Sequence, residues 1–169
     1  KTVVGKGKAI IAKIATSGIY HMSVNGKFVC YGPARAGRGF FRVDEIDLTP
    51  FADQEQNTVI IEVCGYNARS YYLIKQDSFL TAELSADGRV EAYTGNNFTA
   101  RINPEYIKKI QRYSFQRPFA ESYRIIEGDT YFTDAVQGTE PLSYLPQPKY
   151  LKRSTPYPLY EKTGAKRIL

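Results

Sequence analysis

Several residue types are missing or scarce in this 169-residue chain, and each scarcity argues against a class of protein or site. The chain has no Trp, which weakens a lectin interpretation, because sugar rings often stack on aromatic faces. One His and two dispersed Cys argue against a zinc site, which takes four ligands. No run approaches the ~18 apolar residues of a membrane-spanning helix. We therefore expect no metal, no cofactor and no membrane partner.

The first residues and the two cysteines carry little functional signal. The opening KTVVGKGK lacks the apolar segment of a signal peptide, which says little about the compartment. Its GKGK stretch is not a phosphate loop, because it lacks GxxxxGKS or GxxxxGKT spacing and a following helix. Cys30 and Cys64 lie in apolar, strand-like runs, which favours two buried thiols and leaves a disulfide between them open.

Basic residues outnumber acidic ones, but the excess is concentrated near the C-terminus. The net charge is +6, and residues 142–169 account for +5 of it. The other 141 residues hold 17 basic and 16 acidic side chains. Because a nucleic-acid-binding domain usually has a basic face on its folded part, this nearly neutral body argues against a nucleic-acid partner.

Short apolar segments separated by turn residues predict a chain built from β-strands. Tyr20, Met22 and Val24 alternate with more polar residues and should share one strand face. Asn25-Gly26 and Asp87-Gly88 are typical of two-residue hairpin turns, which need a positive φ at both positions. The pattern predicts an all-β fold, an antiparallel β-sandwich or jelly roll of galactose-binding-domain-like type, with at most one short helix.

The composition changes near residue 127, and this change divides the chain into two parts. The first part contains the candidate helix at 104–113, a last core strand at 119–126 and an apolar strand at 59–63, covered on both faces. The second part holds five prolines and no convincing strand. We predict a β-sandwich domain at 1–127, followed at 128–169 by a Pro-rich linker or the start of the next domain.

Few residues are candidates for acid–base chemistry. His21 is expected at the surface or rim of its strand, because catalysis would need a partner within reach and none is indicated. Asp44, Glu45, Asp47 and Asp53 could serve glycoside hydrolysis or calcium binding. Their spacing fits no EF-hand loop, so we interpret them as a solvated strand edge, with Asp44 on the opposite face from Glu45 and Asp47.

Two segments combine aromatic and polar side chains, as binding surfaces do. Residues 65–73 follow the most apolar strand and predict either a sugar pocket or, as the favoured interpretation, an interdomain face. Residues 110–119 interleave Arg112 and Arg117 with aromatic rings. Such a pattern can bind single-stranded nucleic acid, but the neutral body favours a structural role in which Arg ties loops together.

Four segments occur in a fixed order: GIYHMSVNGKFVCYGPARAGRGFFRVDEIDLTPF, NTVIIEVCGYNARSYYL, SFLTAELSADGRV and QRYSFQRPFAESYRI. Together they resemble the N-terminal β-sandwich region of bacterial α-L-rhamnosidase-like glycoside hydrolases, over roughly residues 8–127. The VNG turn followed by a D-x-T and an EV also recurs in the sugar-binding jelly-roll domains of β-galactosidase-type enzymes.

The resemblance implies that catalysis belongs to a separate (α/α)₆ barrel further along the chain. There, acidic residues perform an inverting hydrolysis. This sequence has no long amphipathic helices for such a barrel, so we expect it to lack the catalytic carboxylates. It is then a non-catalytic accessory domain packing on the catalytic domain of the same polypeptide, in the periplasm or outside the cell. The alternative is an autonomous carbohydrate-binding module that takes an oligosaccharide.

The glycine-rich stretch YGPARAGRGFF, residues 31–41, is then the loop that follows the Asn25-Gly26 hairpin. Its glycines permit tight backbone paths. Its two arginines would be free to reach a carboxylate or carbonyl of a neighbouring domain, or a sugar hydroxyl. The candidate sugar-binding or interdomain residues are therefore Arg35, Arg38, Tyr66, Asn67, Tyr71, Tyr72, Arg112 and Arg117.

Overall fold

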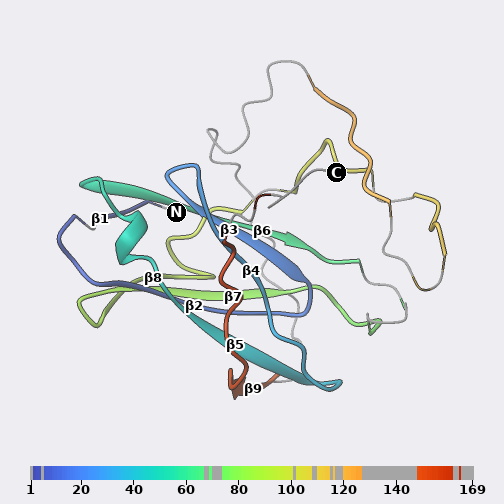
Figure 1. The fold of residues 1–169 in the computed structure, drawn as a ribbon, viewed down its shortest axis with the longest axis horizontal. Helices are drawn as coiled ribbons and strands as arrows, with labels where there is room; N and C mark the ends of the chain where they lie inside the picture. Colours follow the sequence, from blue (N-terminus) through green and yellow to red (C-terminus); the bar gives the residue numbers. More distant parts are fainter. Residues whose placement is uncertain are drawn as a thin grey trace.

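Two β-sheets form the layers of the fold in the computed structural model (Figure 1). It describes residues 2–4, 6–66, 69, 74–100, 102–107, 110–114, 116, 120–126, 148–161 and 164. The first sheet has the strand order β1 (Thr2–Val4), β6 (Gln56–Cys64), β3 (Ile19–Val24), β4 (Lys27–Gly32). The second has the order β8 (Arg89–Tyr93), β7 (Leu80–Ala86), β2 (Ile10–Thr16), β5 (Phe40–Asp47), β9 (Lys149–Lys152). The predicted β-sandwich is confirmed.

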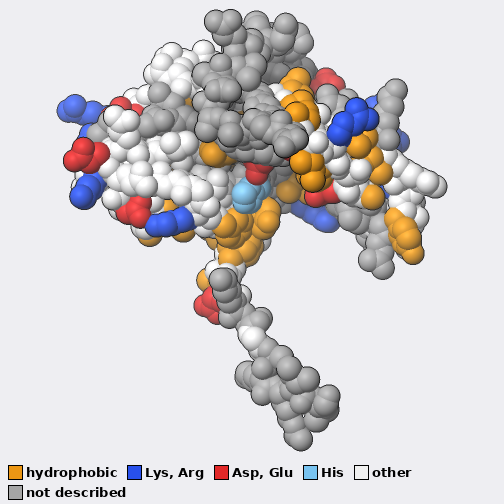
Figure 2. Space-filling view, turned by 90° about the horizontal axis from the view of Figure 1, so that it is seen from above, with side chains coloured by type: hydrophobic (Ala, Val, Ile, Leu, Met, Phe, Trp, Pro, Cys, Tyr) orange, Lys and Arg blue, Asp and Glu red, His pale blue; other side chains and the backbone are white. Residues whose placement is uncertain are grey.

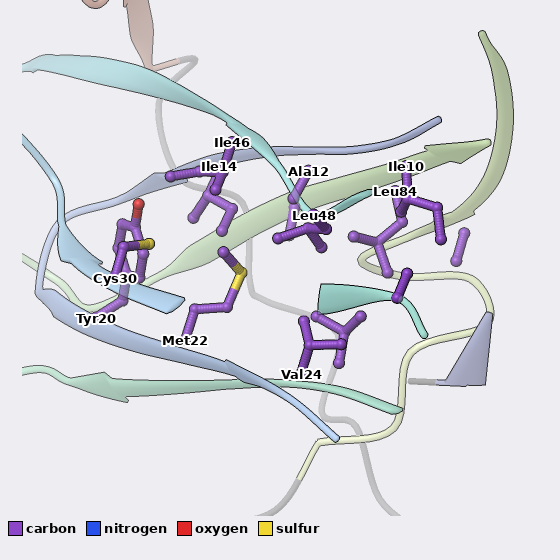
Figure 3. Close-up of a cluster of buried hydrophobic side chains, with 14 residues drawn as sticks. Ile10, Ala12, Ile14, Tyr20, Met22, Val24, Cys30, Ile46, Leu48 and Leu84 are labelled. Atoms are coloured by element: carbon purple, nitrogen blue, oxygen red, sulfur yellow. The ribbon is translucent and has the colours of Figure 1, made fainter. Parts of the chain in front are cut away.

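The core lies between the two sheets and is built by alternation along the strands. In β3 the side chains of Tyr20, Met22 and Val24 are all buried, as predicted. In β2 the buried residues include Ile10, Ala12 and Ile14, whereas Lys13 faces solvent. Figure 3 shows these two sets pointing toward each other, with Ile46, Leu48 and Leu84 among them. Burying such side chains is the main favourable term in folding.

Both predicted hairpin turns are present with the expected backbone conformation. Asn25 has φ 52° and Gly26 has φ 75°; Asp87 and Gly88 have φ 48° and 77°. The Asn25 side chain also donates to the Asn57 Oδ1 atom at 2.9 Å and accepts from the Thr58 N–H at 2.9 Å. The first turn is thereby tied to the start of β6.

Two predicted elements are wrong. The described residues of 104–113 do not form a helix; instead Tyr106 makes an isolated bridge with Tyr123. The described residues of 119–126 form only that bridge, and most of their side chains are exposed, so they are not a core strand. Among the described residues, the one helical segment is the single turn η1, Thr49–Phe51, and no helix could cross a membrane.

A strand occurs where the sequence indicates none. β9 pairs in parallel with β5 and extends the second sheet by one strand, with Phe40 opposite Lys149 and Val43 opposite Lys152. Its neighbours along the chain at 127–147 lie outside the described residues. The domain boundary near residue 127 therefore stays a prediction, but the segment at 148–161 packs on the sandwich.

Gly32 lies against the buried Tyr20 ring and the Asp44 carboxylate, and a Cβ atom there would overlap both. We predict that Gly32→Ala lowers the free energy of unfolding by about 1–3 kcal/mol, the usual effect of overpacking a core. Urea denaturation measures the change. Gly37→Ala is the matched control, because a Cβ there meets nothing within 4 Å. Equal stabilities for the two variants would contradict this account.

Candidate functional site

Three aromatic rings meet on the outer face of the first sheet. His21 points outward because its neighbours Tyr20 and Met22 point into the core. Tyr31 lies opposite His21 in the β3–β4 pairing and also points outward. A bulge in this pairing, between Met22–Cys30 and Ser23–Phe28, places Phe28 on the same face, since a bulge redirects side chains. Phe28 and Tyr31 are 39% and 52% exposed.

Tyr160 from the C-terminal segment joins these rings and completes what we call the aromatic cluster: His21, Phe28, Tyr31 and Tyr160. Its ring packs edge-on against Phe28, with centroids 5.2 Å apart. Its hydroxyl donates to the Tyr31 carbonyl and accepts from the Tyr31 N–H, both at 2.9 Å. β4 is an edge strand, so the Tyr31 N–H and carbonyl groups do not face a further strand. The Tyr160 hydroxyl satisfies both of them. Figure 2 shows hydrophobic side chains gathered beside the histidine.

A carboxylate lies at one edge of the aromatic cluster. Glu62 stands opposite His21 in the β3–β6 pairing, and its Oε2 atom is 2.8 Å from the His21 Nδ1 atom. Both side chains remain partly exposed. The sequence indicated no partner for His21, and this expectation is wrong. The pair juxtaposes a carboxylate and an imidazole that can both hydrogen-bond to a ligand placed on the rings.

A second group of polar residues is buried between the sheets. Asp44, on β5, is 0% exposed and accepts a hydrogen bond from the Tyr20 hydroxyl at 2.7 Å. Its other oxygen pairs with the Arg153 guanidinium at 2.9 Å, and the Arg153 side chain is only 7% exposed. The expected solvated strand edge is therefore wrong for Asp44. It holds for Glu45 and Asp47, which face solvent on the opposite side of β5.

The residues around Arg153 form a clasp that holds the C-terminal segment on the sandwich. The other guanidinium N–H groups donate to the carbonyls of Thr155 and Pro156. The guanidinium lies over the Tyr157 ring, 4.0 Å from its centroid. The Tyr157 hydroxyl in turn accepts from the Glu45 N–H at 2.7 Å, just beyond the point where β9 ends. Residues 153–160 thus contact β5 and β4 in succession.

Burial changes the titration of groups near the clasp. Burial and the hydrogen bond to Asp44 raise the pKa of the Tyr20 phenol above its ordinary range. Burial raises the pKa of the Cys30 thiol to about 11. Cys30 and Cys64 are both free thiols, and Cys64 is only partly buried. The predicted burial is thus confirmed for Cys30 and incomplete for Cys64.

The residues that the sequence singled out do not converge on one site among the described residues. Arg35 and Arg38 are exposed in the loop between β4 and β5, where the Arg35 carbonyl accepts from the Arg42 side chain. Tyr66 is partly buried at the end of β6, where burial and a hydrogen bond with Cys64 raise its pKa. Arg112 is partly buried. The remaining candidates, Asn67, Tyr71, Tyr72 and Arg117, lie outside the described residues.

Comparison with known proteins adds no family assignment. No protein-family model, no curated protein and no solved structure matches this chain. In the part of the chain that the structure describes, no three His, Cys, Asp or Glu side chains are grouped so that they could hold a metal ion.

Removing the clasp arginine should destabilise the fold. Arg153→Ala leaves the Asp44 carboxylate buried without its cationic partner, and breaking such a pair costs about 3–5 kcal/mol. Urea denaturation of the variant measures the loss. Lys152→Ala removes an adjacent exposed cation and should change stability by no more than about 0.5 kcal/mol. A similarly small effect of Arg153→Ala would show that the pair contributes little.

Because the Cys30 thiol is buried, we predict that the free energy of unfolding falls at alkaline pH. The pKa of Cys30 is about 11 in the folded protein and 9.0 ordinarily, so the thiolate forms more readily in the unfolded chain. Stability from this group is complete below pH 9 and falls as the pH rises towards 11. Urea midpoints at pH 8 and pH 10 measure the fall, which should be smaller in Cys30→Ala. An identical fall in both proteins would exclude Cys30 as its cause.

Proposed function

We propose that this chain is a non-catalytic accessory β-sandwich domain of an α-L-rhamnosidase-like glycoside hydrolase. In this proposal it packs on a catalytic (α/α)₆ barrel of the same polypeptide, outside the cytoplasm. The resemblance of the four sequence segments motivates the family, and the all-β fold is compatible with it. A sandwich fold serves many functions, so the role of this domain depends on the side chains at its surface.

The observation that carries this proposal is the amount of apolar surface left uncovered. Among the described residues, seventeen large hydrophobic side chains are exposed. The most exposed include Ile125 at 87%, Tyr113 at 85% and Ile102 at 75%, all within the segment that follows the last sandwich hairpin. Contiguous exposed apolar patches mark contacts with other proteins or domains, and we propose that these three side chains belong to one such patch. A supporting domain needs such a broad surface, rather than one concave pocket.

A carbohydrate-binding module is the second candidate, and the aromatic cluster favours it. Exposed rings beside a carboxylate and an imidazole combine the apolar and polar contacts that a sugar ring requires. The two functions are compatible, since a supporting domain can also hold part of a glycan near a catalytic unit.

The first candidate predicts where rhamnosidase activity resides. The polypeptide that joins residues 1–169 to the proposed barrel should hydrolyse 4-nitrophenyl α-L-rhamnopyranoside, whereas residues 1–169 alone should not. Absorbance of released nitrophenol measures the reaction. Hydrolysis by residues 1–169 alone, or none by the joined polypeptide, would contradict the proposal.

The same polypeptide can test the supporting role. The proposed contact surface contains Ile102, Tyr113 and Ile125. Ile125→Asp places a charge on it and should lower the thermal midpoint of the catalytic unit. Val90→Asp is the matched control, because Val90 is exposed on β8, an element outside that segment. Equal midpoints in the two variants would place the contact elsewhere.

A further inference from the structure

We infer that the aromatic cluster, with Glu62 at its edge, is a stacking site for a neutral pyranose ring of a glycan. This inference rests on the second candidate function and gives it a place and a ligand. The site differs from the segments that the sequence indicated, residues 31–41 and 65–73, because only Tyr31 belongs to either of them. It lies on the outer face of the first sheet, beside β4, the outermost strand on that side of the sheet among the described residues.

The spacing of the rings argues against a cage that encloses a ligand. The centroids of Phe28 and Tyr31 are 5.0 Å apart, and those of Phe28 and Tyr160 are 5.2 Å apart. Rings at these distances are in direct contact, so no ligand group fits between them. An aromatic cage for a quaternary ammonium must enclose the cation, and this cluster does not. What remains available is the exposed outer surface of the rings. Because Tyr31 and Tyr160 are inclined by 48° and 89° to Phe28, the apolar face of a sugar lies on one exposed ring rather than across all of them.

The edge of the cluster sets the charge of the ligand. Glu62 contributes a partly exposed carboxylate, and its His21 partner adds a second group capable of hydrogen bonding. A carboxylate accepts hydrogen bonds from hydroxyl groups and repels anions. Phosphate-bearing ligands such as nucleotides and acidic sugars such as uronates are therefore disfavoured. A pyranose combines an apolar C–H face for the rings with hydroxyls for Glu62.

The cluster is held in place before any ligand arrives. Tyr160 is fixed by two hydrogen bonds to the Tyr31 backbone, and His21 is fixed by Glu62 and by stacking on Phe28 at 5.4 Å. The clasp at Arg153 anchors the segment that carries Tyr160. Side chains that are already ordered lose little entropy on binding, which favours affinity. The C-terminal segment therefore completes the site as well as the fold.

An NMR titration of ¹⁵N-labelled residues 1–169 tests the inference. The probes are L-rhamnose, D-galactose and D-galacturonate, of which the last two differ in one carboxylate. We expect saturable shifts at millimolar concentration from at least one neutral sugar, concentrated at His21, Phe28, Tyr31 and Glu62. D-galacturonate should bind more weakly than D-galactose, and Glu62→Gln should reduce that difference. Shifts from neither neutral sugar, or shifts centred elsewhere, would overturn the inference.

Substitutions in the aromatic cluster test whether its rings bind the sugar. Phe28→Ala should weaken binding about tenfold, the upper end of what one aromatic contact contributes. Tyr31→Leu, which keeps apolar volume and the backbone bonds to Tyr160, should act similarly if Phe28→Ala fails to fold. Tyr93→Ala removes an exposed ring from β8 in the other sheet and should leave affinity unchanged. Unchanged affinity in both cluster variants would refute the site, while the location of rhamnosidase activity would be unaffected.

Discussion

The Asp44 carboxylate is buried between the two sheets, and the arrangement of three separate parts of the chain depends on it. A buried carboxylate without partners is very costly, so its neighbours must supply hydrogen bonds and a positive charge. Tyr20 donates from β3 in the first sheet, and Arg153 supplies the charge from the C-terminal segment. Gly32 leaves room for both the carboxylate and the Tyr20 ring. One side chain thus joins the two sheets and the segment that follows β9.

The same C-terminal segment links the stability of the sandwich to its surface chemistry. Free strand edges invite association with other chains, and native proteins cover them. Here Tyr157 binds the backbone of β5 and Tyr160 binds the backbone of β4, an edge strand. Tyr160 also contributes the fourth ring of the aromatic cluster. A segment that resembles a linker in composition therefore protects an edge and builds the proposed binding surface.

The aromatic cluster shows how far a strand pattern can predict a site. Alternation along residues 19–24 correctly predicted that His21 points away from Tyr20 and Met22. Simple alternation along β4 would place Phe28 on the same side as the buried Cys30, and only the bulge moves it to the outer face. The partner of His21 is Glu62, which becomes its neighbour through the pairing of β3 with β6. Neither feature has a signal in the local sequence.

The sequence by itself determined the features that depend on neighbours along the chain: the all-β class, the core face of β3 and the hairpin turns at Asn25-Gly26 and Asp87-Gly88. Pleat alternation and positive φ act over a few residues, so composition and spacing reveal them. Only the tertiary structure decided that Asp44 is buried, because its cation lies 109 residues further along the chain. It also placed β9 beside β5 and Tyr160 among the rings. Pairings between distant segments depend on how the sheets pack, and residue spacing does not encode them locally.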